Sequence, residues 1–217
     1  MKFSFSIFLL FLLGIMSFDA QAQKDPKAKT VLDAMSQKYQ NMKGYTAGFD
    51  YTYSDAGGSG DRQSGELAVK GAKYRLKLPD QEIFNDGKTV WTLIQTDTYK
   101  EVTINDVTQM EGELTPSNIY KMYQTGFNYR LLADKTYQGK SVNVVELIAQ
   151  KADAPFKQLK LMVDKTTKDL LGWEMSDGVG GVFTYSFKNV KSAPNLPEDY
   201  FTFDPKKYPG IEIIDLR

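Results

Sequence analysis

The stretch Tyr45–Tyr53, with the sequence YTAGFDYTY, decides the fold. Its apolar and aromatic residues occupy every second position and alternate with threonine, glycine and aspartate. Successive side chains of a β-strand point to opposite faces of the sheet, so a period of two is typical of a strand with one buried face. We therefore expect Tyr45–Tyr53 to be a half-buried strand with an aromatic face.

Short runs of the same kind follow along most of the chain. They are separated by tight turns such as Asn85-Asp86-Gly87-Lys88, and Asp-Gly between two apolar runs is a strong hairpin signal. Long helices do not alternate with the runs, so parallel βαβ units are not expected. The pattern predicts about eleven strands in one strongly curved, antiparallel sheet. The later runs are Glu66–Lys70, Lys73–Leu78, Glu82–Asn85, Thr89–Gln95, Thr98–Ile104, Phe127–Asp134, Ser141–Ala149, Phe156–Asp164, Asp169–Ser176 and Gly181–Asn189.

Two amphipathic helices are expected to lie on this sheet. The first begins at Asp25-Pro26, an N-cap followed by a first-turn proline, and ends at Gly44. The second begins at Thr115, stops at Gly126 and is too short to be stable unless it docks on the sheet. At helical spacing the first carries Ala28, Val31, Leu32, Met35, Tyr39 and Met42, and the second carries Ile119, Tyr120, Met122 and Tyr123.

The first 22 residues are typical of a secretory signal peptide. Lys2 precedes the apolar stretch Phe3–Met16, and Ala20-Gln21-Ala22 supplies small residues at the usual cleavage positions. A transmembrane anchor is the alternative, but the apolar stretch is short for a hydrocarbon core of ~30 Å. We expect cleavage after Ala22, which would leave residues 23–217 as one domain in the periplasm.

The composition excludes several classes of function. The chain has 217 residues, 27 basic and 27 acidic side chains, and neither histidine nor cysteine. Catalytic triads, cysteine nucleophiles, Cys/His zinc sites and disulfides therefore cannot form. The balanced charge gives no basic footprint for nucleic acid. We expect no enzyme activity, no metal and no cofactor, although a pair of carboxylates brought together by the fold stays open as a catalytic alternative.

The usage of apolar residues leaves two interpretations open. The chain contains 13 tyrosines, 13 phenylalanines and 8 methionines. Aromatic side chains are expected in an ordinary β core. Methionine and aromatic residues are also suited to line a cavity that adapts to a flexible ligand. The sequence alone does not decide between a solid interior and a hollow one.

Three segments resemble the periplasmic lipoprotein carrier family, LolA. Gly65–Lys70 followed by Lys73–Leu76 is similar to its opening strands, and Asn85–Trp91 is similar to its Asp-Gly-Lys-hydrophobic-Trp hairpin. The end of the chain, Phe201–Pro205 with Pro209–Asp215, is similar to its Phe-x-Phe and Pro-x-Gly-Val-x-Val pattern. The order and spacing of the three segments match over essentially the whole chain after the signal peptide.

The resemblance implies a fold and a role. The fold is an open, incomplete antiparallel β-barrel with helices as a lid over an apolar cavity. The role is that of a periplasmic chaperone that accepts acylated lipoproteins from an inner-membrane release transporter and carries them to an outer-membrane acceptor, acting as a monomer. Proteobacterial members have a basic gate residue just after the Leu-x-Val-Lys strand, but Gly71 stands there in this chain.

The expected lipid-binding residues follow from the two helices and one face of the strands. Trp91 and Leu93 share a face opposite to that of Val90 and Ile94, so only one of these two sets can line the cavity. The expected lid comprises Val31, Leu32, Met35, Tyr39, Met42, Ile119, Met122 and Tyr123, and the expected floor comprises Phe49, Tyr51, Leu67, Val69, Tyr74, Leu76, Trp91 and Leu93.

Two alternative functions remain open. The same fold could serve a lipid- or glycolipid-binding or sensing protein that does not deliver lipoproteins. A solid interior would instead favour a scaffold or interaction protein.

Overall fold

A computed structural model describes residues 24–55, 60, 62–110, 113–152, 154, 156–176 and 180–217. The expected signal peptide lies outside these residues. Within them one α-helix, α1 (Pro26–Met42), precedes thirteen strands. The strands are β1 (Tyr45–Ser54), β2 (Arg62–Lys70), β3 (Lys73–Lys77), β4 (Gln81–Asn85), β5 (Thr89–Gln95), β6 (Lys100–Asp106), β7 (Phe127–Leu131), β8 (Lys135–Tyr137), β9 (Lys140–Ala149), β10 (Gln158–Asp164), β11 (Leu170–Ser176), β12 (Val182–Ser192) and β13 (Glu212–Asp215).

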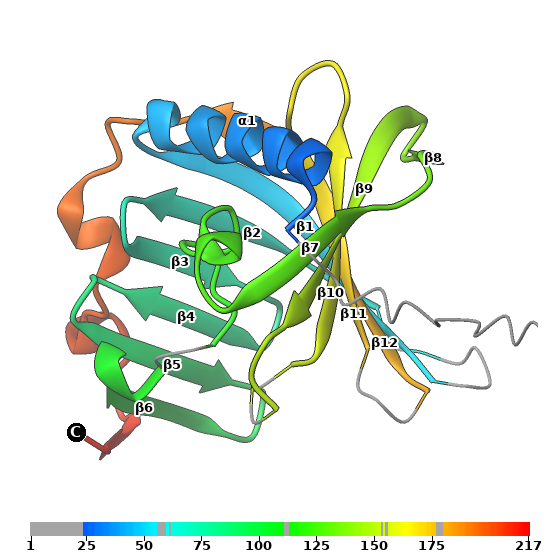
Figure 1. Ribbon diagram of the computed structural model, residues 1–217. Coiled ribbons are helices and arrows are strands. Elements are labelled where there is room, and N and C mark those ends of the chain that lie inside the picture. The colour runs from blue at the N-terminus through cyan, green and yellow to red at the C-terminus, as the bar shows by residue number, and fades with distance from the viewer. Residues whose placement is uncertain are drawn as a thin grey trace, which may run out of the picture.

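All thirteen strands belong to one open sheet. Its order is β13-β6-β5-β4-β3-β2-β1-β12-β11-β10-β9-β7, and β8 pairs with β9 to one side. Neighbouring strands are antiparallel except for β13, which runs parallel to β6. The sheet curves strongly, and α1 lies across its concave face (Figure 1). The expected open antiparallel sheet is confirmed, but the expected number of strands, about eleven, was too low because β8 and β13 are short.

The second expected helix is wrong. Residues 116–121 form turns, followed only by a 3-10 turn, η2 (Met122–Gln124). The Asn118 side chain accepts a hydrogen bond from the Thr115 N–H (2.9 Å) and donates one to the Glu113 carbonyl (2.8 Å). Such side-chain bonds to the backbone compete with helical bonding. The segment nevertheless docks on the sheet through Ile119 and Tyr123, as its apolar side predicted.

Helix α1 forms as its sequence predicts. The Asp25 carboxylate accepts a hydrogen bond from the Lys27 N–H (2.8 Å), and Pro26 occupies the first turn. The helix ends at Lys43, which adopts a left-handed conformation at φ 58° beside Gly44. Its buried face consists of Ala28, Leu32, Met35, Ser36 and Tyr39.

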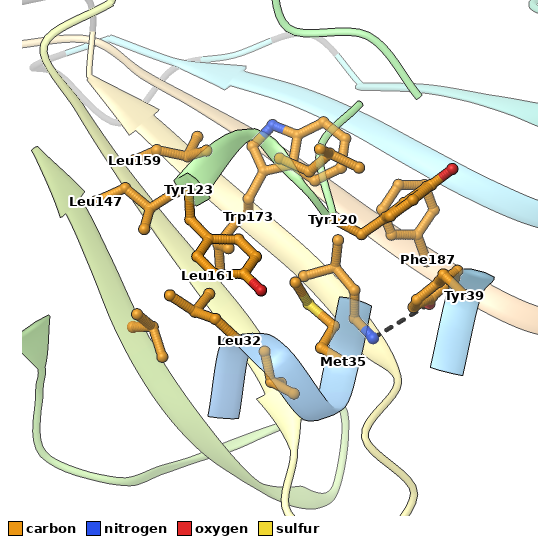
Figure 2. Close-up of a cluster of buried hydrophobic side chains, with 14 of the residues drawn as sticks. Leu32, Met35, Tyr39, Tyr120, Tyr123, Leu147, Leu159, Leu161, Trp173 and Phe187 are labelled. Carbon is orange, nitrogen blue, oxygen red and sulfur yellow. Dashed lines mark hydrogen bonds between the residues drawn. The ribbon is translucent and has the colours of Figure 1, made fainter. Parts of the chain in front are cut away.

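The apolar residues form clusters on both faces of the sheet. Beneath α1, Leu32 and Met35 pack against Leu147 and Leu161 of β9 and β10 (Figure 2). On the convex face, Phe84 packs with residues of the C-terminal segment that follows β12. Among the described residues, no helix has the length and apolar character needed to cross a membrane.

Candidate functional site

An apolar pocket of about 430 Å³ opens on the concave face, beyond the end of the cluster under α1. Strands β1–β4 and β11–β12 form its floor, and the segment before η2 forms one wall. Its volume falls in the range of small-molecule sites, roughly 300–1,000 Å³. The lining residues are Phe49, Leu67, Tyr74, Leu76, Ile83, Met110, Glu113, Leu114, Thr115, Pro116, Phe156, Trp173, Met175, Tyr185 and Phe187.

The strand register explains why these side chains meet. Leu76 of β3 pairs with Leu67 of β2 and with Ile83 of β4, and directly opposed residues point to the same face. On the other side of β1, Phe49 pairs with Phe187, and Tyr185 pairs with Trp173. The floor of the pocket is therefore a continuous apolar surface across six neighbouring strands.

Aromatic rings form a row along this floor. Tyr53 lies against Phe183 with ring centroids 4.8 Å apart, and Tyr51 lies 5.1 Å from Tyr185. Tyr185 stacks on the Trp173 ring at 4.8 Å. Burial raises the pKa of the Tyr185 hydroxyl to about 12, so this residue is neutral at physiological pH. The row ends at Phe187, 5.1 Å from Trp173.

The structure divides the expected lipid-binding residues among several places. Phe49, Leu67, Tyr74 and Leu76 line the pocket. Leu32, Met35, Ile119 and Tyr123 belong to the same apolar cluster but lie outside the pocket lining. Tyr39 and Val69 also belong to that cluster and line a separate pocket of about 450 Å³ near the end of α1. Val31, Met42, Tyr51 and Met122 are partly buried at the margin of that cluster.

Two expected residues, Trp91 and Leu93, lie on the wrong face. The neighbouring Thr92 pairs with the pocket residue Ile83, so alternation along β5 turns Trp91 and Leu93 to the convex face. There they pack with Phe84, Val102 and Phe203 under the C-terminal segment. Trp91 and Leu93 therefore do not line this pocket, contrary to expectation.

Several lining residues were missed from the sequence, chiefly Trp173, Met175, Tyr185 and Phe187. Each lies in a strand that was expected, at every second position of β11 or β12. Their alternation was visible in the sequence, but the pairing of β12 with β1, which brings them to the pocket, was not. The wall formed by Met110 and by residues 113–116 carries no periodic signal.

Buried tyrosine hydroxyls connect α1 and the pocket wall to the sheet. The Tyr39 hydroxyl accepts a hydrogen bond from the Leu170 N–H (3.2 Å), the dashed line in Figure 2. The Tyr45 hydroxyl donates to the carbonyl of Pro116 (3.2 Å), a residue that lines the pocket. Burial raises the pKa of Tyr39 and of Tyr45 well above the ordinary value. Both groups are therefore neutral hydrogen-bonding residues.

Gly71, where the resemblance implies a basic gate residue, lies in the β2–β3 turn at φ +62°, a backbone conformation that favours glycine. The nearby basic residues are engaged elsewhere. Lys70 and Lys73 pair with Glu198, and Arg75 pairs with Glu82, all on the convex side. These ion pairs lower the pKa of Glu198 to about 2, with Lys73 as the larger cause. None of the three side chains reaches the pocket lining.

Comparison with known proteins identifies the family. The sequence model of the family described as "Outer membrane lipoprotein carrier protein LolA" matches residues 40–204. The chain belongs to the LolA family. An outer-membrane lipoprotein carrier protein of Legionella pneumophila strain Lens is 25% identical over 213 residues, covering 94% of this chain and 98% of that protein.

Two further proteins are similar to this chain. An uncharacterized protein of Methanocaldococcus jannaschii is 31% identical over 213 residues, and the match covers 94% of this chain but 59% of the archaeal protein. The crystal structure of an uncharacterized conserved protein from Thermus thermophilus superposes with a TM-score of 0.59 at 12% identity, covering 87% of this chain and 99% of that one. This last similarity shows a shared fold alone.

Proposed function

We propose that this protein is a periplasmic carrier that binds acyl chains of lipoproteins released from the inner membrane and takes them toward the outer membrane. The observation that carries the proposal is the apolar pocket on the concave face, whose floor is made by Phe49, Leu67, Leu76 and Ile83. Membership of a family described as lipoprotein carriers supports the same role.

The apolar lining of the pocket suits an apolar ligand. An acyl chain in water is unfavourable by about 0.8 kcal/mol per methylene, so binding it in an apolar site is strongly driven. A carrier must also release its cargo. Met110 and Met175 in the walls have flexible side chains that adapt to a ligand without fixing one shape.

We expect that the pocket can enlarge if α1 moves and the cluster beneath it opens. Leu32 and Met35 are fully buried, and Tyr39 accepts a hydrogen bond from the Leu170 N–H and packs its ring against Tyr45 and Tyr120. Movement of α1 away from β9–β11 would join this region to the pocket and admit further chains. In this proposal α1 and the 113–124 segment form the lid.

Binding of a fluorescent tripalmitoylated lipopeptide to the purified protein tests the proposal. We expect saturable binding, and replacement of Leu76 by glutamine should weaken it roughly tenfold or more, because a polar side chain then faces the ligand. The matched control is Lys77→Gln, the next residue of β3, which is exposed and faces away from the pocket. Equal affinity of the two variants would contradict the assignment of the pocket.

Delivery distinguishes a carrier from a protein that only binds or senses lipid. Inner-membrane vesicles that hold a labelled lipoprotein should lose it to the added protein, and outer-membrane vesicles should then receive it. Binding without transfer would favour the sensing function. Absence of any lipid binding would contradict both the carrier function and the sensing function.

A further inference from the structure

Trp173, which lines the apolar pocket, contains a buried polar atom without a hydrogen-bond partner. The side chain is 5% exposed, and its indole nitrogen Nε1 has no hydrogen-bond partner. Among the described residues no other buried side-chain nitrogen or oxygen is left unpaired. Buried polar groups are nearly always paired because an unpaired one destabilises the fold. The exception therefore needs an explanation.

Packing alone does not require a tryptophan at this position. The Trp173 ring stacks on Tyr185 and lies against Phe187. A phenylalanine would make aromatic contacts of the same kind without burying an N–H group. The indole nitrogen points away from α1 and from the closely packed cluster beneath it (Figure 2). The hydroxyl of Thr115, another polar group of the pocket lining, is by contrast paired with that of Ser117 at 3.2 Å.

We propose that the Trp173 N–H is the donor that binds a carbonyl oxygen of the ligand, so that the pocket selects ester- or amide-linked acyl chains over plain alkyl chains. The indole N–H only donates, so its partner must carry an acceptor. The carbonyl at the head of an acyl chain is the acceptor that such a ligand brings into an apolar site. The inference rests on the proposed lipid-binding function and adds the chemical class of the ligand.

A hydrogen bond between the Trp173 N–H and a ligand carbonyl requires side chains of the pocket wall to move. Nε1 is covered by neighbouring atoms, so side chains must shift before a ligand oxygen reaches it. Met175 lies two residues further along β11, on the same face, and also lines the pocket. Its unbranched side chain can change conformation at little cost. The rings of Tyr185 and Phe187 meanwhile hold the indole in place.

A matched pair of lipids tests the inference. Palmitoyl lysophosphatidylcholine has an ester carbonyl, whereas its hexadecyl ether analogue has the same headgroup and chain length without that carbonyl. We expect the wild-type protein to bind the ester roughly fivefold more tightly, as one net hydrogen bond predicts. Trp173→Phe should bind both lipids with equal affinity, and its ether affinity should match or exceed that of the wild type.

The outcomes separate the inference from the function on which it rests. Equal affinity of the wild type for ester and ether would overturn the role of Trp173 while leaving lipid binding intact. Failure of the wild type to bind either lipid would overturn both. A ratio unchanged by Trp173→Phe would assign the selectivity to another group.

Nuclear magnetic resonance of the wild-type indole N–H gives a second readout that does not depend on the variant folding. Trp91→Phe identifies the Trp173 resonance by elimination, because the chain has two tryptophans. The ester should move that proton resonance downfield, as expected for a new hydrogen bond, and the ether should not. Identical shifts with both lipids would contradict the proposal.

Discussion

The Asp25 carboxylate joins the start of α1 to the edge of the sheet at Leu131. One oxygen accepts from the Lys27 N–H at 2.8 Å inside the helix, and the other accepts from the Leu131 N–H at 3.0 Å. The Asp25 N–H in turn donates to the carbonyl of Tyr129 (3.0 Å). The hydrogen bonds from the Leu131 N–H, the largest cause, and from the Lys27 N–H lower the pKa of the Asp25 carboxyl. A single residue thus caps the helix and covers part of the edge strand β7.

Replacement of Asp25 should loosen both contacts. Asp25→Ala is expected to lower the thermal midpoint and to speed amide exchange at Leu131, because both acceptors are lost. Asp25→Asn keeps one acceptor oxygen and should fall between the wild type and the alanine variant. Lys29→Ala, which removes only an exposed pair with Asp33, is the control. Equal exchange at Leu131 in all four proteins would refute this role.

Tyr45→Phe should release the wall of the pocket. The Tyr45 hydroxyl is the donor to the Pro116 carbonyl, so its loss is expected to lower the free energy of unfolding by about 1 kcal/mol. Amide exchange of Ile119 and Tyr123 should accelerate, and a bound acyl probe should dissociate faster. Tyr99→Phe removes a hydroxyl from an exposed tyrosine and serves as the control. Unchanged dissociation in Tyr45→Phe would show that the bond does not hold the wall.

Arg75 should be the residue that fastens the C-terminal segment to the sheet. Its guanidinium lies between the rings of Phe84 (4.7 Å) and Tyr200 (4.6 Å) and pairs with Glu82 at 2.7 Å. Arg75→Met is expected to destabilise the protein by about 1–2 kcal/mol and to speed proteolysis after β12.

Two variants control the Arg75 experiment. Arg75→Lys keeps the charge but not the flat guanidinium, so it should lose most of the same stability. Lys77→Met changes an exposed residue of the same strand and should have little effect. Cleavage at the wild-type rate in Arg75→Met would contradict the fastening role.

Asp50 should contribute to the acid sensitivity of the fold. Lys188, then Ser64 and Arg62, lower its pKa from 3.8 to about 2. Because the folded-state pKa is below the ordinary value, the stabilisation is complete above pH 3.8 and is lost as the pH falls toward about 2. Asp50→Asn should be less stable at neutral pH and show a shallower fall in this range, measured by urea unfolding at several pH values. If the stability of Asp50→Asn fell with pH as steeply as that of the wild type, Asp50 would not be a source of the acid sensitivity.

The local pattern of the sequence was enough for α1 and most strands, but not for the site. Asp25, Pro26 and the apolar spacing of α1 act within one element, and so does the alternation in β1. The face of β5 that meets the pocket depends on the register with β4, which periodicity leaves open. For that reason Trp91 and Leu93 were assigned to the wrong side.

The division between solid core and pocket also lay beyond the sequence. Met35 and Leu76 are equally apolar members of periodic patterns, yet one is fully buried under α1 and the other faces the pocket. The difference arises from where α1 ends and how the 113–124 segment turns. The Asn118 side chain contributes two hydrogen bonds to that turn, one from the Thr115 N–H and one to the Glu113 carbonyl.

The pairing of β1 with β12 has a consequence for how the molecule is made. Tyr45 lies opposite Ser192, so the middle of the sheet joins the first strand of the chain to one of the last. A ribosome or a translocation channel delivers the amino end first, so β1 emerges long before β12, one of its two neighbours in the sheet. Pairing of segments so far apart in the sequence is slow. Until β12 has emerged, the unpaired edge of β1 is a site at which we expect a chaperone to bind the nascent chain.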